Sequence, residues 1–102
     1  MNERKGVQKK FSRAVELGLP GSFYYKIADT GSLGGKKPWD ALLLYAGKAF
    51  AIEFKKEGKL KTTDYQTFHL WKWEQNGGTS FIVNEKNMKA VLKEITKICR
   101  NQ

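Results

Sequence analysis

Two apolar stretches on either side of Ala46-Gly47 constrain the fold of this chain more than any other feature of its sequence. We expect Ala41–Tyr45 and residues 49–55 to form antiparallel strands joined by a tight turn, because both stretches are rich in strand-forming residues. Counting outward from the turn places Asp40 directly opposite Glu53, with Cβ atoms about 5 Å apart. Ala-Gly is not the most favourable pair for such a turn, and a one-residue slip would separate the two acids.

Three charged side chains meet on one face of this predicted hairpin. Glu53 and Lys55 are two residues apart, so they point to the same side of the sheet, where Asp40 also lies. Two carboxylates this close repel each other unless a positive charge lies between them. A divalent metal site is the interpretation we favour, because Mg²⁺ is commonly held by one or two carboxylates with waters and phosphates. The alternative is a surface ion pair between Glu53 and Lys55, which would contribute little.

The second strand of the hairpin has two different faces. Phe50, Ile52 and Phe54 lie on one face and are expected to be core residues. The other face carries only small alanines before it reaches Glu53 and Lys55. We expect an open site on that face, because a wholly exposed face would carry longer polar residues.

The other periodic segments give the chain the order α-β-β-β-α-β-α. Apolar residues three or four apart predict helices, and short runs of aromatic and β-branched residues predict strands. This order predicts an α/β fold with a mixed central sheet flanked by helices. Besides the hairpin, the predicted helices cover residues 5–17, 64–75 and 87–99, and the predicted strands cover residues 22–28 and 79–83.

Size and composition fit one small folded domain. The chain has 102 residues, of which 40% are hydrophobic, so we assign residues 1–102 to a single domain with one modest core. We expect no membrane span, because no apolar run reaches 18 residues. We also expect no signal peptide and no internal disulfide, since Cys99 is the only cysteine, and both expectations favour a cytoplasmic location.

The chain is strongly basic, and its charge points to an anionic partner. Its 19 Lys and Arg residues outnumber 10 Asp and Glu residues, which gives a net charge of +9 at pH 7. Such an excess is typical of proteins that bind polyanions, although it also increases solubility. Charge alone does not choose between DNA, RNA and anionic lipid. The paired carboxylates favour phosphodiesters as the partner.

A glycine-rich, basic loop at residues 29–37 leads into Asp40. Glycines let a backbone approach a ligand closely, and Lys36-Lys37 adds charge at the end of the loop. We expect this loop to contact DNA, with a plain surface loop as the alternative. Its spacing does not match a phosphate-binding P-loop, so no nucleotide cofactor is expected.

The sequence does not support a zinc site or a catalytic triad. His69 is the only histidine and Cys99 the only cysteine, so these two residue types cannot fill four zinc positions. We expect His69 to be half-buried or on a helix surface. We expect Cys99 to lie in the apolar stripe of the last helix, as a small hydrophobic residue.

Asp40, followed on the next strand by Glu53-Phe54-Lys55, resembles the PD-(D/E)XK nuclease superfamily in this order of elements. Longer segments are similar to the Holliday junction resolvases of the RecU type and to the stand-alone VRR-NUC domains of phages. The resemblance covers residues 5–83 and implies a restriction-endonuclease-like core. The segments that carry it are Lys37-Pro38-Trp39-Asp40, Gly47-Lys48-Ala49-Phe50-Ala51-Ile52-Glu53-Phe54-Lys55, Gly58-Lys59-Leu60-Lys61, Gln66 and Gly77-Gly78-Thr79-Ser80-Phe81-Ile82-Val83.

The resemblance implies roles for five residues. Asp40 and Glu53 would be metal ligands, and the backbone carbonyl of Phe54 would contribute a further oxygen. Lys55 would orient the attacking water or stabilise the phosphate. Gln66 would lie on the helix beside the site and position Lys55 or the water. These roles agree with the chemistry of metal-assisted phosphodiester hydrolysis.

The first helix departs from the pattern of these families, whose members often carry a further acid there. Gln8 or Lys10 occupies the matching place, while Glu3 comes too early and Glu16 too late. Gln8 would still hold a metal-bound water. The missing carboxylate would weaken a second metal site, and it leaves room for an inactive member of the superfamily.

The predicted function is Mg²⁺- or Mn²⁺-dependent endonucleolytic hydrolysis of DNA, most specifically at branched structures such as four-way junctions. Two symmetric cuts at a two-fold junction imply a homodimer, with Trp39 or Trp71 at the interface. One alternative is a phage-type VRR-NUC nickase or a general duplex endonuclease. Another is a non-catalytic DNA-binding module on the same fold, and an RNA-binding role is weaker because no RNA-reading aromatic pattern is evident. The small size favours a viral or prokaryotic origin.

Basic residues on the first helix and in the loops around the acids are the predicted DNA contacts. On the helix they form the face opposite the apolar stripe, so a solvated surface is the alternative interpretation. The predicted DNA-binding residues are Lys5, Lys9, Lys10, Arg13, Lys36, Lys37, Lys56, Lys59 and Lys61.

Overall fold

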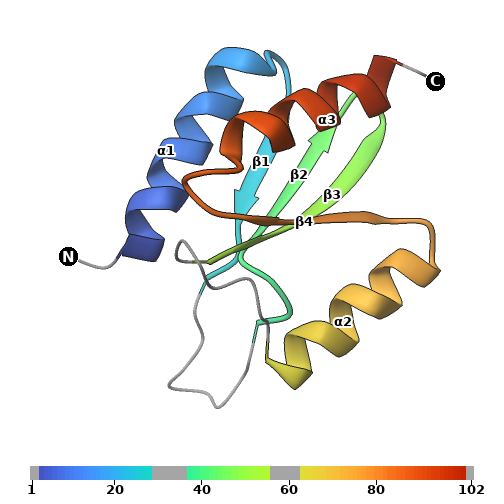
Figure 1. Ribbon diagram of the computed structural model, residues 1–102. Coiled ribbons are helices and arrows are strands. Elements are labelled where there is room, and N and C mark those ends of the chain that lie inside the picture. The colour runs from blue at the N-terminus through green and yellow to red at the C-terminus, as the bar shows by residue number, and fades with distance from the viewer. Residues whose placement is uncertain (1–2, 29–36, 56–62, 101–102) are drawn as a thin grey trace.

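The computed structural model describes residues 3–28, 37–55 and 63–100, which form a four-stranded sheet with three helices (Figure 1). The strands lie in the order β1-β2-β3-β4; β2 is antiparallel to both β1 and β3, and β4 is parallel to β3. The predicted α/β fold and its mixed sheet are confirmed. The elements are α1 (Glu3–Gly18), β1 (Phe23–Lys26), β2 (Ala41–Tyr45), β3 (Lys48–Phe54), α2 (Asp64–Gln75), β4 (Thr79–Val83) and α3 (Met88–Arg100).

Element bounds follow the predictions closely, except at the first strand. β1 is shorter than the predicted residues 22–28 because it pairs only with β2, from Phe23 opposite Leu44 to Lys26 opposite Ala41. The ladder therefore ends where β2 begins. None of the described helices is long and apolar enough to cross a membrane.

The central hairpin has the predicted register. Tyr45 pairs with Lys48 and Ala41 with Ile52, and the backbone N–H of Asp40 donates to the Ile52 carbonyl at 3.0 Å. Both turn residues have positive φ, 52° at Ala46 and 77° at Gly47, as a type I′ turn requires. The left-handed conformation costs an alanine about 1–2 kcal/mol, but the turn still fixes the register.

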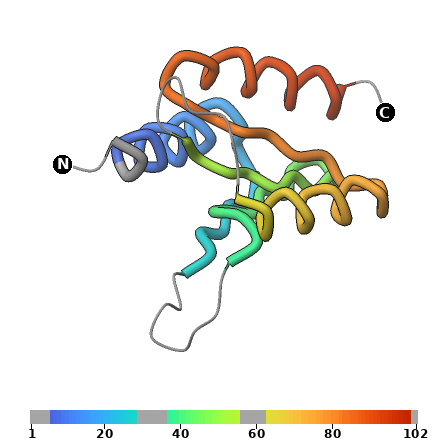
Figure 2. Tube along the Cα trace, turned by 60° about the horizontal axis from the view of Figure 1, so that its bottom comes forward, coloured from blue at the N-terminus to red at the C-terminus, as the bar shows by residue number. Residues whose placement is uncertain are grey.

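The core lies between one face of the sheet and two helices. α1 and α3 cover this face, while α2 lies on the opposite side (Figure 1, Figure 2). Phe50, Ile52 and Phe54 are fully buried in this core, as the alternation of β3 predicts. Phe11 of α1 packs edge-on against Phe54, with ring centroids 5.5 Å apart, and Ile95 of α3 is also fully buried.

The second face of β3 is not the open surface that its small residues suggest. Ala51 and Glu53 have no exposed surface, because α2 lies over this side of the sheet (Figure 2). The side chain of Trp73 ties α2 to β4, since its Nε1 donates to the Thr79 carbonyl at 2.8 Å. The prediction of an open site on this face is therefore wrong.

Gly78 lies where the chain passes close to Trp73. A Cβ at this position would be 2.3 Å from the Trp73 Nε1. We expect Gly78→Ala to lower the free energy of unfolding by about 1–3 kcal/mol, because the indole must move and weaken its bond to Thr79. Urea unfolding measures this change. In the control Gly6→Ala, where a Cβ meets nothing within 4 Å, we expect a gain of about 0.5–1 kcal/mol within α1. Equal losses in both variants would contradict the close approach.

Candidate active site

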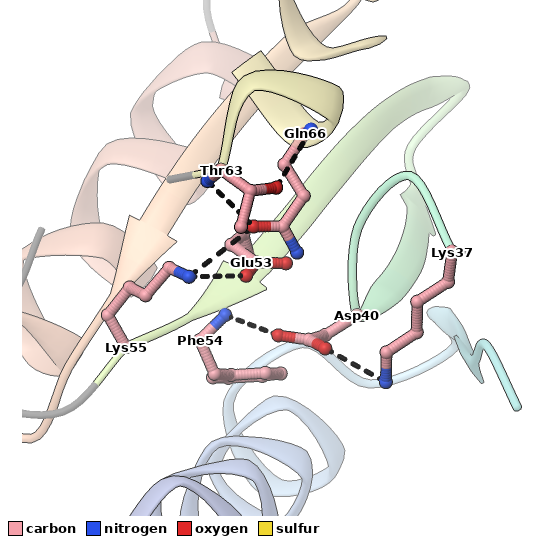
Figure 3. Close-up of polar contacts among 7 residues, drawn as sticks. All are labelled: Lys37, Asp40, Glu53, Phe54, Lys55, Thr63 and Gln66. Atoms are coloured by element: carbon pink, nitrogen blue, oxygen red, sulfur yellow. Dashed lines mark hydrogen bonds and ion pairs between the residues drawn. The ribbon is translucent and has the colours of Figure 1, made fainter. Parts of the chain in front are cut away.

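The hairpin brings Asp40, Glu53 and Lys55 together at one end of the sheet (Figure 3). Asp40 lies directly before β2, Glu53 lies near the end of β3, and Lys55 follows β3. The Nζ of Lys55 is 3.2 Å from the Oε2 of Glu53, so the two side chains share one face as their spacing predicts. Both carboxylates are fully buried, whereas 19% of the Lys55 side chain is exposed.

Asp40 is a buried acid with fixed partners. Its Oδ2 accepts a hydrogen bond from the backbone N–H of Phe54 at 2.8 Å, which links the two strands beyond the ladder. Its Oδ1 is 3.0 Å from the Nζ of Lys37, three residues earlier in the chain. These contacts orient the carboxylate and offset the cost of burying its charge.

Glu53 is as buried as Asp40 but has fewer hydrogen-bond partners. Among the described residues, neither carboxylate oxygen accepts a hydrogen bond, and Lys55 lies only within ion-pair distance. Burial, followed by the nearby charge of Asp40, raises the pKa of the Glu53 carboxyl to about 7, while Lys55 opposes this increase. A buried carboxylate of this kind gains from a proton or a cation.

The first turn of α2 holds Gln66 against Lys55. The Nζ of Lys55 is 3.4 Å from the Oε1 of Gln66, which is also 3.4 Å from the backbone N of Thr63. In return, the Gln66 N–H donates to the Thr63 Oγ1 at 3.2 Å, which completes a capping box. The spacing Thr-x-x-Gln is a sequence signature of this motif, so Thr63 was recognisable as the residue that fixes Gln66.

Comparison with known proteins rests on structure, because no family model and no curated protein matches the sequence. A solved structure described as a VRR_NUC domain superposes on this chain with a TM-score of 0.75. The match covers 91% of this chain and 97% of the other, at 21% sequence identity. The chain has the fold of a VRR-NUC domain. This likeness confirms the fold that the Asp40 and Glu53-Phe54-Lys55 pattern predicts.

Within this VRR-NUC fold the two acids fit a hard divalent cation. Mg²⁺ and Mn²⁺ prefer oxygen ligands, and Mg²⁺ needs only one or two carboxylates besides water and phosphate. The Glu53 oxygens, buried without hydrogen bonds, are suited to such a ligand role. Among the residues that the structure describes, no three His, Cys, Asp or Glu side chains converge, as a zinc site would require. The Phe54 carbonyl stays a predicted ligand.

Gln8 lines a cavity beside α1. This cavity has a volume of about 410 Å³. Tyr24 also lines it, and burial, followed by the nearby charge of Asp40, raises the pKa of this tyrosine. A water bound to Gln8 near the metal stays a prediction. The lining residues are Gln8, Lys9, Ser12, Tyr24 and Lys26.

The basic residues predicted to bind DNA differ in their exposure and in their partners within the protein. Lys9 and Arg13 are exposed on α1, as a DNA contact requires. Lys10 forms an ion pair with Glu85, and Lys37 pairs with Asp40, so both lysines have partners within the protein. The structure does not describe Lys36, Lys56, Lys59 and Lys61 or the side chain of Lys5, so these contacts stay predictions.

Three further residues singled out in the sequence lie outside the acid pair. His69 is half-buried, as expected, with its ring centroid 4.4 Å from that of Tyr65. Cys99 packs against the core, and its Sγ is 3.5 Å from the Tyr45 carbonyl. Trp39 is only partly exposed, because its ring lies 4.9 Å from that of Trp73.

Proposed function

We propose that this protein is a divalent-metal-dependent nuclease that hydrolyses DNA phosphodiester bonds at Asp40 and Glu53. The observation that carries the proposal is the Glu53 carboxylate, which is fully buried without a hydrogen bond from any described residue. Its charged partner among the described residues is Lys55, at 3.2 Å, and a bound metal ion would lower the cost of burying this carboxylate beside Asp40. The VRR-NUC fold and the net charge of +9 support a nucleic acid as the substrate.

The residues around the acids divide the work of hydrolysis. A bound Mg²⁺ or Mn²⁺ would lower the pKa of water and neutralise charge on the phosphate. Asp40, held by the Phe54 N–H, and Glu53 would hold this ion. Lys55 presents its ammonium beside Glu53, where it would stabilise the phosphate or orient the attacking water. Gln66 acts as a positioning residue through its contact with the Lys55 Nζ.

Branched DNA is the substrate that we propose, with a homodimer making paired cuts. An uncovered apolar patch on β1 and β2 supports self-association: Phe23 and Tyr25 are each 56% exposed, and Leu44 is 39% exposed. Patches of this kind mark interaction surfaces. Of the two tryptophans predicted at the interface, Trp71 is well exposed on α2, whereas Trp39 is packed against Trp73.

A second candidate function is DNA binding without cleavage. The observation that favours it is Gln8, which stands on α1 where related nucleases often carry an acid. Loss of a carboxylate weakens the hold on a second metal ion but leaves the basic surface intact. In that case the protein binds DNA with Mg²⁺ present and never cuts it.

A cleavage assay separates these functions. Purified protein with Mg²⁺ or Mn²⁺ is given end-labelled linear duplex, single-stranded DNA and an immobile four-way junction. We expect paired symmetric nicks in the junction, and a loss of about 100-fold or more in rate for Lys55→Ala. Equal cleavage of the duplex would keep the site and overturn the junction preference. Binding without any cleavage would overturn the nuclease proposal in favour of the binding module.

Removing the Gln66 amide tests its link to Lys55. We expect Gln66→Ala to lower kcat about 10-fold with little change in KM, because Lys55 loses a fixed partner. Thr63→Ala is the matched control: it removes the N-cap and costs about 1 kcal/mol of stability, but it leaves the Gln66 side chain. If both variants lose the same activity, capping of α2 explains the effect and the positioning role is wrong.

A further inference from the structure

A basic surface away from the candidate active site lies along α3, next to the C-terminal end of α1. It is a groove of about 700 Å³, partly lined by Leu19 and Leu92. Its charged lining is entirely basic and comes from one face of α3, at spacings of four, four and three residues. We call this set, Lys89, Lys93, Lys97 and Arg100, the α3 basic row.

None of the acids that the structure describes forms an ion pair with the α3 basic row. The ion pairs between described residues involve Lys10, Lys37 and Lys55, and none of them includes a residue of the row. Glu94 is the acidic residue of α3, but it does not line the groove. The row therefore presents its charge to solvent.

The stability of α3 does not explain why all four residues of the row are basic. Lys97 and Arg100 lie in the last turn of α3, where cations interact favourably with the helix dipole. Lys89 lies in the first turn, where the same dipole disfavours a cation. The pairs 89 and 93, and 93 and 97, place like charges four residues apart, which costs about 0.2–0.5 kcal/mol each. An anionic ligand would relieve this repulsion.

The row and the candidate active site lie on different sides of the molecule. α3 covers the face of the sheet that it shares with α1, whereas Lys55 contacts Gln66 of α2 on the opposite side (Figure 1, Figure 2). A phosphate bound beside Glu53 and Lys55 therefore does not reach the row.

We propose that the α3 basic row binds the phosphate backbone of a second nucleic-acid segment, separate from the one that enters the candidate active site. From Lys89 to Arg100 the row extends about 16 Å, at about 1.5 Å per helical residue. Each strand of a DNA duplex carries a charge about every 3.4 Å along the duplex axis, so a row of this length can contact several backbone phosphates. Its donors lie in a line and do not converge, as a site for a small anion would require. The choice of DNA as ligand rests on the proposed function.

The test compares two double variants that remove the same charge. Lys89→Gln with Lys93→Gln changes the row, and Lys48→Gln with Lys72→Gln changes exposed lysines outside the groove. Binding to a four-way junction is measured by fluorescence anisotropy in EDTA over a range of salt concentrations, so that no cleavage is needed. We expect the row variant to bind about 10-fold more weakly at low salt, with the slope of log K against log[salt] shallower by about 2. The matched variant is expected to change affinity less than about 3-fold.

Each outcome decides the proposal. Restored binding in Lys89→Arg with Lys93→Arg supports it, and so does unchanged cleavage of a short duplex by the Gln variant. Equal losses in the two Gln variants overturn it, because general charge then explains binding. A loss of binding to phosphatidylserine vesicles, with DNA binding unchanged, assigns the row to a membrane surface and also overturns it. If the protein binds DNA through the row but never cuts any substrate, the proposed nuclease function fails and this proposal stands.

Discussion

Glu53→Gln is expected to lose metal-dependent DNA cleavage and yet to gain stability in metal-free solution at pH 8. The rate falls by about 100-fold or more, because an amide is a poor ligand for a hard cation and Lys55 loses its partner. Stability rises by about 2 kcal/mol, because the variant no longer buries a charge without hydrogen bonds. Cleavage assays and urea unfolding measure the two effects on the same preparation.

The pH dependence of this gain has a definite sign. The pKa of Glu53 is about 7 in the folded protein, against an ordinary value of 4.5. Between these values the folded protein holds a proton that the unfolded chain has released, so stability falls as pH rises. The loss levels off about one pH unit above the folded pKa, once the carboxyl is ionised in the folded protein as well. The stability difference between Glu53→Gln and the native protein should therefore grow from pH 5 to pH 8.

A divalent metal ion should make the native protein more stable than Glu53→Gln. On the proposed function, Mg²⁺ or Mn²⁺ would bind the ionised carboxylate and stabilise the native protein by mass action, whereas Glu53→Gln would gain little. A melting temperature measured at pH 8 with and without Mn²⁺ shows the difference. A stability difference that stays the same from pH 5 to pH 8 would contradict the buried, unsatisfied state of Glu53.

Asp40→Ala is expected to have the opposite effect on stability. The Phe54 N–H and the Lys37 ammonium, at 2.8 and 3.0 Å from the carboxylate, both lose their partner in a buried place. We expect the free energy of unfolding to fall by about 3 kcal/mol, with cleavage also lost. Urea unfolding at pH 7 measures the change.

Asp40→Asn is the matched control for this prediction. Its amide oxygen can still accept from the Phe54 N–H while the ion pair with Lys37 is lost, and we expect a cost of about 1 kcal/mol. Equal stability of Asp40→Ala and the native protein would show that these contacts do not stabilise the fold.

The sequence predicted the hairpin well, together with the meeting of Asp40 and Glu53 that follows from it. The alternation of buried and other residues along β3 and the short turn leave little freedom in the register of the two strands. Ala46 occupies a left-handed position that alanine disfavours, yet Tyr45 still pairs with Lys48. A slip by one residue would have turned Phe50, Ile52 and Phe54 out of the core. Hydrophobic burial therefore supports the register that the turn sequence alone specifies weakly.

The environment of the acids was less predictable, because it depends on contacts between distant segments. The alanine-rich face of β3 suggested an open site, but Ala51 and Glu53 on that face are fully buried. The contact of Lys37 with Asp40 depends on the path of a loop, and a basic loop residue suggested DNA instead. The groove beside the α3 basic row also requires the packing of α1 against α3, which periodicity does not give.

The most direct test of the central claim is a titration of the purified protein with Mn²⁺, followed by calorimetry or by electron paramagnetic resonance. We expect saturable binding to the native protein that is lost in Glu53→Gln and weakened in Asp40→Asn. Thr63→Ala, which leaves both carboxylates in place, should bind Mn²⁺ as the native protein does. Native-like Mn²⁺ binding by Glu53→Gln would contradict a metal site at Asp40 and Glu53.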